Sequence, residues 1–200
     1  MADQFKSKNS KVLSTSIKVW PFFSKFRNSG NNSKREPNSF LYVSSSAAHK
    51  NQYILLESFT RFFDQCGAGS LHLTFEDGDD EITKKVYELK AKGYPIFNHG
   101  FLSRDALARL YGKSEFVVYP SLSESFGLGL IEGINMGCKV LAADLPYTYA
   151  VCEPSAVFDP YSSVSISKVM IQAARNGVPN PKALVRDNID SLIAFLNGDP

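Results

Sequence analysis

The chain has 200 residues, of which 44% are hydrophobic and 21% charged, as is typical of a folded globular protein with a sizeable core. No apolar run approaches the roughly 18 residues that a membrane span needs, and residues 1–11 lack the apolar centre of a secretion signal. The three cysteines, Cys66, Cys138 and Cys152, show no metal-binding spacing, so we expect reduced thiols in a cytoplasmic protein.

The net charge of +2 hides an asymmetry along the chain. Residues 1–39 carry eight Lys/Arg against two acids, a net of +6, and residues 40–200 carry fourteen against eighteen, a net of −4. The basic end is open to two interpretations: a solvated segment, or contact with an anionic membrane face or a partner domain. Aromatic and basic residues do not alternate along one surface, which argues against a nucleic-acid partner.

The first part of the chain differs from the rest in composition. Residues 1–23 could form a short helix and a strand, "SIKVWPFF", and residues 24–39 are polar and read as a linker. From Phe40 onward short apolar runs alternate with stretches of helical periodicity. We expect strands at residues 40–45, 71–75, 94–98, 115–120, 138–144 and 156–160. We expect helices at residues 50–66, 79–92, 103–111, 127–137, 163–176 and 181–197.

This alternation predicts an α/β fold, a doubly wound parallel sheet of Rossmann-like type, because parallel neighbours need crossover helices. Such sheets bind ligands at the carboxyl ends of their strands. Ser103 is a plausible N-cap for the helix that follows it.

The stretch "SESFGLGLIEG" follows the strand that Pro120 closes and opens a glycine-rich helix. Each glycine inside a helix costs about 1 kcal/mol relative to alanine, so these glycines need a reason. Gly133 and Gly137 fit close packing against the sheet, with Gly137 a C-cap candidate. Gly127 and Gly129 lie in the first turn, where bare amides form an anion site suited to a diphosphate.

Two acidic residues of this stretch, Glu124 and Glu132, stand eight positions apart. Glu132 has apolar neighbours, so it either faces solvent on the one wet side of the helix or accepts hydrogen bonds from paired hydroxyls such as a ribose diol. Glu124 precedes the helix, and is either a loop acid near a helix start or an acceptor for a sugar attached to the phosphates.

The segment "PSLSESFGLGLIEGINMGCKVLAAD" resembles the E-x7-E signature of retaining GT-B glycosyltransferases, the group 1 type. "FLYVSSSAAHKNQYILLESF" resembles the first strand, loop and helix of that family's C-terminal domain, and "GFLSRDALARLYGKSEFVVYPS" and "AVFDPYSSVSISKVM" resemble later units. The resemblance covers about residues 40–176, with several motifs in register.

The resemblance implies a role for each matching position. Glu124 would contact the hydroxyls of the donor sugar, Lys50 would bind the diphosphate, and these two are the candidate catalytic residues. Glu132 would bind the ribose diol. Four candidates would offer backbone groups to phosphate and sugar: Phe126, Gly127, Leu128 and Gly129. Two others, Gly100 and Leu102, would border the nucleobase.

Two departures from the family pattern stand out. In the family, the loop after the first strand carries a Gly-Arg pair whose arginine clamps the diphosphate. Here Ser44 and Ser45 replace that pair, and Lys50 is the one cation of the family's loop pattern that remains. Ser45 is still a candidate residue for binding the nucleotide sugar. The chain is also about half the size of family enzymes. Residues 1–39 therefore read as the tail of a missing N-terminal domain with its interdomain linker, and residues 40–200 as the nucleotide-sugar-binding domain with closing helices.

The resemblance implies transfer of a hexose from a nucleoside-diphosphate sugar, of UDP or GDP type, to an acceptor hydroxyl in polysaccharide or glycolipid biosynthesis. It implies no cofactor and no metal. Partners would be the acceptor glycan or glycolipid and an N-terminal acceptor-binding domain in cis or trans, with peripheral contact at the inner membrane face. The isolated chain would be inactive. The rival hypothesis is a non-catalytic subunit that binds a nucleotide sugar or a partner chain.

Three further signals favour structural roles. The acids of "EDGDDE", including an Asp77–Asp79 D-x-D match, follow a strand and open a helix, so we interpret them as a helix-start cluster. His49, His72 and His99 are far apart in sequence, although His49 could touch phosphate. The tyrosines of "LPYTYAVCEP" either line the cleft or pack in the core.

Overall fold

The computed structural model describes Phe26 and residues 34–197, so the helix and strand expected within residues 1–23 lie outside the described residues. The chain divides into two compact units. One is Lys25–Leu184, and the other joins residues 1–24 to residues 185–200 and contains helix α8 (Ile189–Leu196). The candidate site belongs to the first unit.

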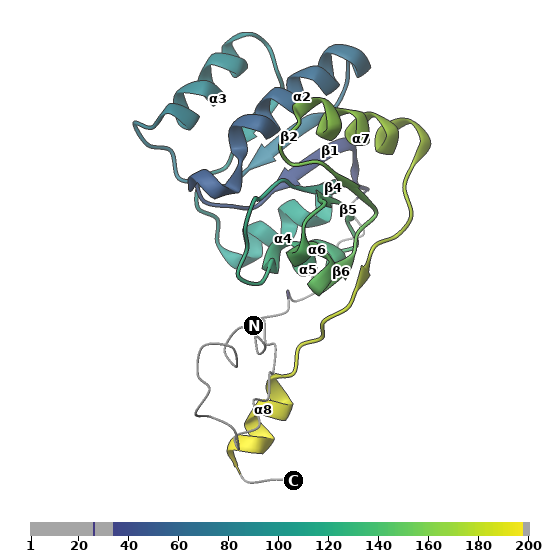
Figure 1. Ribbon diagram of the computed structural model, residues 1–200. Coiled ribbons are helices and arrows are strands. Elements are labelled where there is room, and N and C mark those ends of the chain that lie inside the picture. The colour runs from purple at the N-terminus through teal and green to yellow at the C-terminus, as the bar shows by residue number, and fades with distance from the viewer. Residues whose placement is uncertain (1–25, 27–33, 198–200) are drawn as a thin grey trace, which may run out of the picture. The chain divides into compact units, whose positions relative to one another are not determined.

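A parallel six-stranded sheet forms the centre of this unit, in the order β3-β2-β1-β4-β5-β7 (Figure 1). Its strands are β1 (Glu36–Tyr42), β2 (Ser70–Leu73), β3 (Ile96–Asn98), β4 (Ser114–Tyr119), β5 (Lys139–Ala143) and β7 (Ala156–Phe158). The order reverses between β1 and β4, which places a topological switch point there. The predicted doubly wound α/β fold is confirmed.

Helices lie on both faces of the sheet, as crossover connections require (Figure 1). One group is α2 (Gln52–Cys66), α3 (Glu81–Ala91) and α7 (Ser163–Asn176). The other is α4 (Arg104–Lys113), α5 (Leu128–Asn135) and the short α6 (Pro146–Val151). A 3-10 turn, η1 (Ala48–Lys50), precedes α2. A two-stranded antiparallel pair, β6 (Cys152–Glu153) with β8 (Lys182–Ala183), completes the unit.

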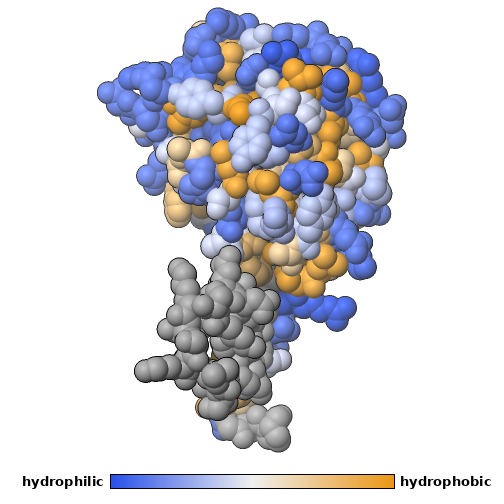
Figure 2. Space-filling model, in the orientation of Figure 1, coloured by the Kyte–Doolittle hydropathy of each residue, from blue (hydrophilic) through white to orange (hydrophobic). Residues whose placement is uncertain are grey.

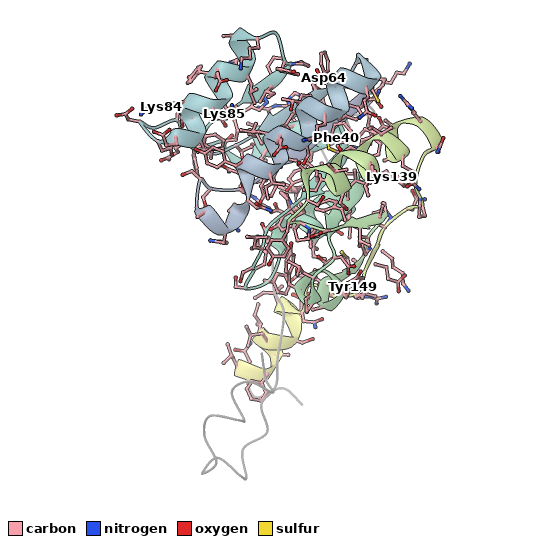
Figure 3. All side chains as sticks on the ribbon, turned by 45° about the horizontal axis from the view of Figure 1, so that its top comes forward. Phe40, Asp64, Lys84, Lys85, Lys139 and Tyr149 are labelled. Carbon is pink, nitrogen blue, oxygen red and sulfur yellow. The ribbon has the colours of Figure 1, made fainter. Side chains whose placement is uncertain are left out.

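Aromatic side chains fill the core between α2 and the sheet, with Phe40 at their centre (Figure 3). The Phe40 ring stacks on that of Phe116 with centroids 5.0 Å apart and meets the edge of Phe62 at 4.9 Å. All three are fully buried, and each large side chain contributes about 1.5–3 kcal/mol of transfer free energy. This packing fixes α2, and hence the loop that precedes it, on β1.

Three elements differ from the sequence predictions. Strand β1 begins at Glu36 rather than Phe40, because an irregularity with Asn38 at φ 56° lets the strand continue past Pro37. The predicted helix at residues 181–197 is wrong in its first half: β8 pairs there with β6, and α8 begins at Ile189. Helix α6 was not expected.

Among the helices of Phe26 and residues 34–197, none is both long and apolar enough to cross a membrane.

Candidate functional site

Two loops meet at the carboxyl ends of the central strands β1 and β4. The amide of Leu122 donates to the carbonyl of His49 at 2.8 Å. The Asn51 side chain, buried between the loops, donates to the carbonyls of Pro120 and Pro160 at 3.1 and 2.7 Å. Asn51 itself has φ 60°, a left-handed conformation that asparagine tolerates. The loop carrying Lys50 and the loop carrying Glu124 are thus fixed against each other.

Lys50 and Glu124, the two candidate catalytic residues, form an ion pair. The Lys50 Nζ atom lies 2.7 Å from Glu124 Oε1, and the side chains are only 17% and 8% exposed. The backbone of Lys50 is held as well, because the Tyr42 hydroxyl donates to its carbonyl at 2.9 Å. The structure therefore brings a cation and an acceptor together at the sheet edge where the sequence predicted them.

Phenol side chains, two of them buried and one half-buried, lie around Glu124. The hydroxyls of Tyr42 and Ser121 lie 2.6 Å apart, and Tyr147 donates to the Ser121 carbonyl at 2.7 Å. Burial, and next the negative charge of Glu124, raises the pKa of Tyr119 above its usual range. These phenols stay protonated at neutral pH and can donate hydrogen bonds without adding negative charge. Tyr147 is half-buried here, whereas Tyr149 is exposed and donates to Asp144 at 2.6 Å (Figure 3).

The glycine-rich helix start lies directly after this loop. Gly127 has φ 79° and precedes α5, and no side chain caps the amides of the first turn. A Cβ at Gly129 would lie 2.9 Å from the Tyr119 ring, and one at Gly133 would lie 2.7 Å from the Val117 side chain. Gly133 is thus required by close packing on the sheet, as predicted. Gly129 is required by packing too, a constraint that the sequence did not indicate.

The predicted C-cap role of Gly137 is confirmed, since Gly137 follows α5 with φ 78° and its amide donates to the carbonyl of Ile134. Its predicted packing on the sheet is wrong, because a Cβ there would meet the Arg35 side chain at 3.0 Å and no atom of the sheet. Of the other candidates, Phe126 precedes this helix start, and Leu128, 40% exposed, opens it.

Glu132 is only 5% exposed, so the alternative that placed it in solvent is wrong. Arg104 donates to its Oε1 at 2.6 Å and the Tyr111 hydroxyl donates to its Oε2 at 3.1 Å. The Arg104 guanidinium also lies over the ring of Phe26, 4.0 Å from its centroid. Burial, with the charge of Glu132 next, raises the pKa of Tyr111 well above its usual range. A carboxylate has about four acceptor positions, so Glu132 keeps acceptor capacity beyond these two bonds.

A pocket of about 400 Å³ opens between the loops after β1 and β2 and the start of α4. Its walls come from residues 43–46, residues 74–76, and Phe101, Leu102 and Leu107. Two predicted residues, Ser45 and Leu102, line it; Gly100 turns the adjoining chain with φ 64°. Glu124, Lys50 and Glu132 do not line this pocket, so the predicted site residues fall into three neighbouring groups.

The acidic residues after β2 are used locally, as predicted. Asp80 accepts from the amide of Thr83 and caps α3, Asp79 pairs with Lys84 at 3.0 Å, and Asp77 accepts from Tyr87 and Asn98. Within Phe26 and residues 34–197, no three histidine, cysteine or acidic side chains form a group that could hold a metal ion. The α3 end of the unit is covered by hydrophilic side chains (Figure 2), with Lys84 and Lys85 projecting from it (Figure 3).

Several neighbours of the candidate residues were not expected from the sequence. Arg104, Tyr111, Tyr119 and Tyr42 reach the two glutamates or their loops from other elements, and no spacing pattern links them. His72 and His99 also meet, with Nδ1 and Nε2 2.9 Å apart, although 27 positions separate them in the chain. Only the register of β2 with β3 brings these rings together.

A model of the family Glycosyl transferases group 1 matches residues 24–188. The O-antigen chain mannosyltransferase RfbU of Salmonella typhimurium is 28% identical over 161 residues, which cover 78% of this chain and 42% of RfbU. The chain thus spans less than half the length of this curated relative.

Two solved structures share the fold. The pneumococcal O-GlcNAc transferase GtfA, in complex with UDP and GlcNAc, matches 88% of this chain and 37% of its own with a TM-score of 0.67 and 18% identity. The GtfA/B complex matches 60% of this chain and 23% of its own with a TM-score of 0.52 and 24% identity.

Proposed function

Because this chain belongs to the family Glycosyl transferases group 1, we propose that its α/β unit is the donor-binding half of a retaining GT-B glycosyltransferase. The observation that carries the proposal is the 2.7 Å pair of Lys50 and Glu124 beside the uncapped start of α5. A ligand in which a sugar is attached to phosphates suits this arrangement. The ammonium and the uncapped amides can bind the phosphates, and the carboxylate can accept hydrogen bonds from the sugar hydroxyls.

In the proposed reaction the bond between the hexose and the diphosphate breaks, and a bond from the oxygen of an acceptor hydroxyl to the same carbon forms. The proton of that hydroxyl passes to an oxygen of the departing diphosphate. The departing diphosphate gains negative charge. The Lys50 ammonium and the first-turn amides of α5, at Leu128 and Gly129, stabilise that charge, and no metal or other cofactor takes part. Glu124 accepts hydrogen bonds from hydroxyls of the donor hexose, and Glu132 accepts from the ribose diol.

We propose a lipid-linked or polymeric glycan as the acceptor, because RfbU is named as an O-antigen chain mannosyltransferase. An acceptor-binding domain, in cis or as a separate chain, supplies the other wall of the cleft. The span of the match, 42% of RfbU, supports this requirement, and the GtfA/B complex is a precedent for a protein of this fold in a complex. The eight Lys/Arg within residues 1–39 suit peripheral contact with an anionic membrane face.

Calorimetric titration of the whole chain with UDP- and GDP-hexoses tests the donor assignment. We expect at least one donor to bind. We expect Lys50→Ala to weaken its binding, whereas Lys85→Ala, a change of a partly exposed residue on α3, should not. Absence of binding by every donor in the panel would contradict the proposal. The purified chain alone should show negligible transfer, since water is not excluded from half a cleft.

A non-catalytic subunit is the second candidate, and the loop between β1 and α2 favours it. Residues 43–51 contain no arginine, so the diphosphate lacks a fork-shaped cation from this loop. Such a subunit would bind the donor yet give no product. Supplying an acceptor-binding domain and acceptor separates the two candidates: product formation that Lys50→Ala abolishes supports the enzyme, and donor binding without product supports the subunit.

A further inference from the structure

We propose that the pocket between β1, β2 and α4 takes a guanine base, and that the Glu76 carboxylate selects it. The inference rests on the proposed function, because it names the nucleotide class of the same donor. Glu76 belongs to the acidic cluster of residues 76–81, which lies after β2 and reaches the start of α3.

The pocket has the size and walls of a site for a flat heterocycle. Its volume is about 400 Å³, and Leu102 and Leu107 contribute apolar surface to its lining. Phe101 lies in its lining with 84% of its surface exposed, so its ring is available for stacking. Stacking a base on an aromatic ring contributes about 1–3 kcal/mol for any base, so these walls alone do not select one.

Two of the four hydroxyl side chains that line the pocket accept hydrogen bonds within the chain. Thr74 Oγ1 accepts from the amide of Ser44 at 3.3 Å, and Ser44 Oγ accepts from Gln52 at 3.0 Å. Glu76 carries the only charge among the described residues that line the pocket, and no hydrogen bond or ion pair joins it to another described residue. The neighbouring acids differ, since Asp77, Asp79 and Asp80 each have a partner.

A carboxylate at a nucleotide site must lie away from the phosphates, because like charges repel. The groups proposed to bind the phosphates, Lys50 and the start of α5, do not line this pocket. The pocket with Glu76 can therefore hold the base. Glu76 is acceptor-only when ionised, so it favours a base that presents N–H donors side by side.

Guanine satisfies this requirement better than uracil. Its N1–H and exocyclic N2–H₂ lie next to each other and can bond to both oxygens of one carboxylate, giving charge-assisted bonds. Uracil presents a single N–H between two carbonyl oxygens, and those oxygens would face the negative charge. A carboxylate in this position therefore favours guanine and disfavours uracil.

The test is calorimetric titration of the whole chain with GDP, IDP and UDP. We expect GDP to bind about ten- to a hundredfold more tightly than UDP, as one good bidentate pair provides. IDP, which lacks the exocyclic amine, should bind between the two. This series uses the unmodified chain, so it does not depend on a variant that folds.

Glu76→Gln sharpens the test, with Glu81→Gln as the matched control. Both remove one exposed carboxylate near the start of α3, but Glu81 does not line this pocket. Glu76→Gln should lower the affinity for GDP by about tenfold or more and leave the affinity for UDP equal or higher. Glu81→Gln should change neither affinity.

Three results have distinct meanings. If no nucleoside diphosphate binds, the proposed donor function fails and this inference fails with it. If UDP binds as tightly as GDP or more tightly, the donor function stands and the guanine assignment is overturned. Unchanged GDP affinity in Glu76→Gln would also overturn the role of Glu76.

Discussion

Glu124 and Glu132 come from one eleven-residue stretch, yet the structure gives them different surroundings. Glu124 lies in a loop at the sheet edge, paired with Lys50, whose flexible stem can move to admit a ligand. Glu132 lies inside α5, where Arg104 and the buried Tyr111 each bond to one of its oxygens. The comparison teaches that one motif can combine a residue that is free to serve a ligand with one that also holds two helices together.

The largest effect is expected at the Glu124 end. Lys50→Ala should lower the transfer rate, measured with an acceptor-binding domain present, by about a hundred- to a thousandfold, because a preorganised donor to the leaving group is lost. Lys85→Ala is the matched control. A rate within a factor of two of the unchanged protein would remove Lys50 from the reaction.

For stability, the larger loss is expected at Glu132, whereas for the transfer rate it is expected at the Glu124 end. Glu132→Gln should lower the free energy of unfolding by about 2–4 kcal/mol, because it breaks a buried pair and weakens the bond from Tyr111. Glu124→Gln should lower it by less, because the Gln side-chain oxygen can still accept from the Lys50 ammonium and no arginine fork loses a partner. Urea unfolding followed by circular dichroism measures both, and equal losses would erase the distinction.

The ligand role of Glu132 can be tested independently of its structural role. If it accepts from a ribose diol, Glu132→Gln should weaken nucleotide binding about ten- to a hundredfold, a loss of roughly 1.5–3 kcal/mol. The affinity for a 2′,3′-dideoxy nucleotide should fall far less, because that nucleotide has no diol for Glu132 to bind. Calorimetry with both ligands decides the matter: the same loss for each would leave Glu132 a purely structural residue.

A pH experiment compares the phenols beside the two carboxylates. Burial raises the pKa of Tyr111 and Tyr119, so each stays protonated in the fold when the unfolded chain ionises near pH 10. The contribution of each tyrosine to the free energy of unfolding is therefore fully present below about pH 10. Above that pH it falls by up to about 1.4 kcal/mol per pH unit.

Tyr111→Phe and Tyr119→Phe should each reduce this alkaline loss, as measured by chemical denaturation at about pH 10 and about pH 11. Tyr53→Phe, an exposed change on α2, provides the control. Alkaline slopes that match the unchanged protein would show that these phenols ionise normally in the fold.

The smallest effect concerns the ring of Phe26, which covers Arg104 at 4.0 Å and lies 5.5 Å from the Tyr111 ring. Because Arg104 is half exposed, the cation–π contact should contribute only about 0.5–1 kcal/mol. A double-mutant cycle of Phe26→Leu with Arg104→Gln should give a coupling of that size. Additive losses would show that Phe26 does not support the partner of Glu132.

Local pattern was sufficient for most of the fold. Six strands and five of the helices fall where apolar runs and helical periodicity placed them, because strand and helix periods are written in short stretches of sequence. Pattern failed where pairing between distant segments decided the outcome. The helix expected at residues 181–197 begins only at Ile189, because residues 182–183 pair with β6.

The sequence by itself determined the parallel α/β fold, the close packing of Gly133 on the sheet, and the nearness of Lys50 to Glu124, since both follow strands that meet at the switch point. Only the tertiary structure decided the surroundings of Glu132. Its partners, Arg104 and Tyr111, come from the preceding helix at 28 and 21 positions' distance. A buried carboxylate must find donors wherever the packed helices present them, and that geometry is not encoded in any local spacing.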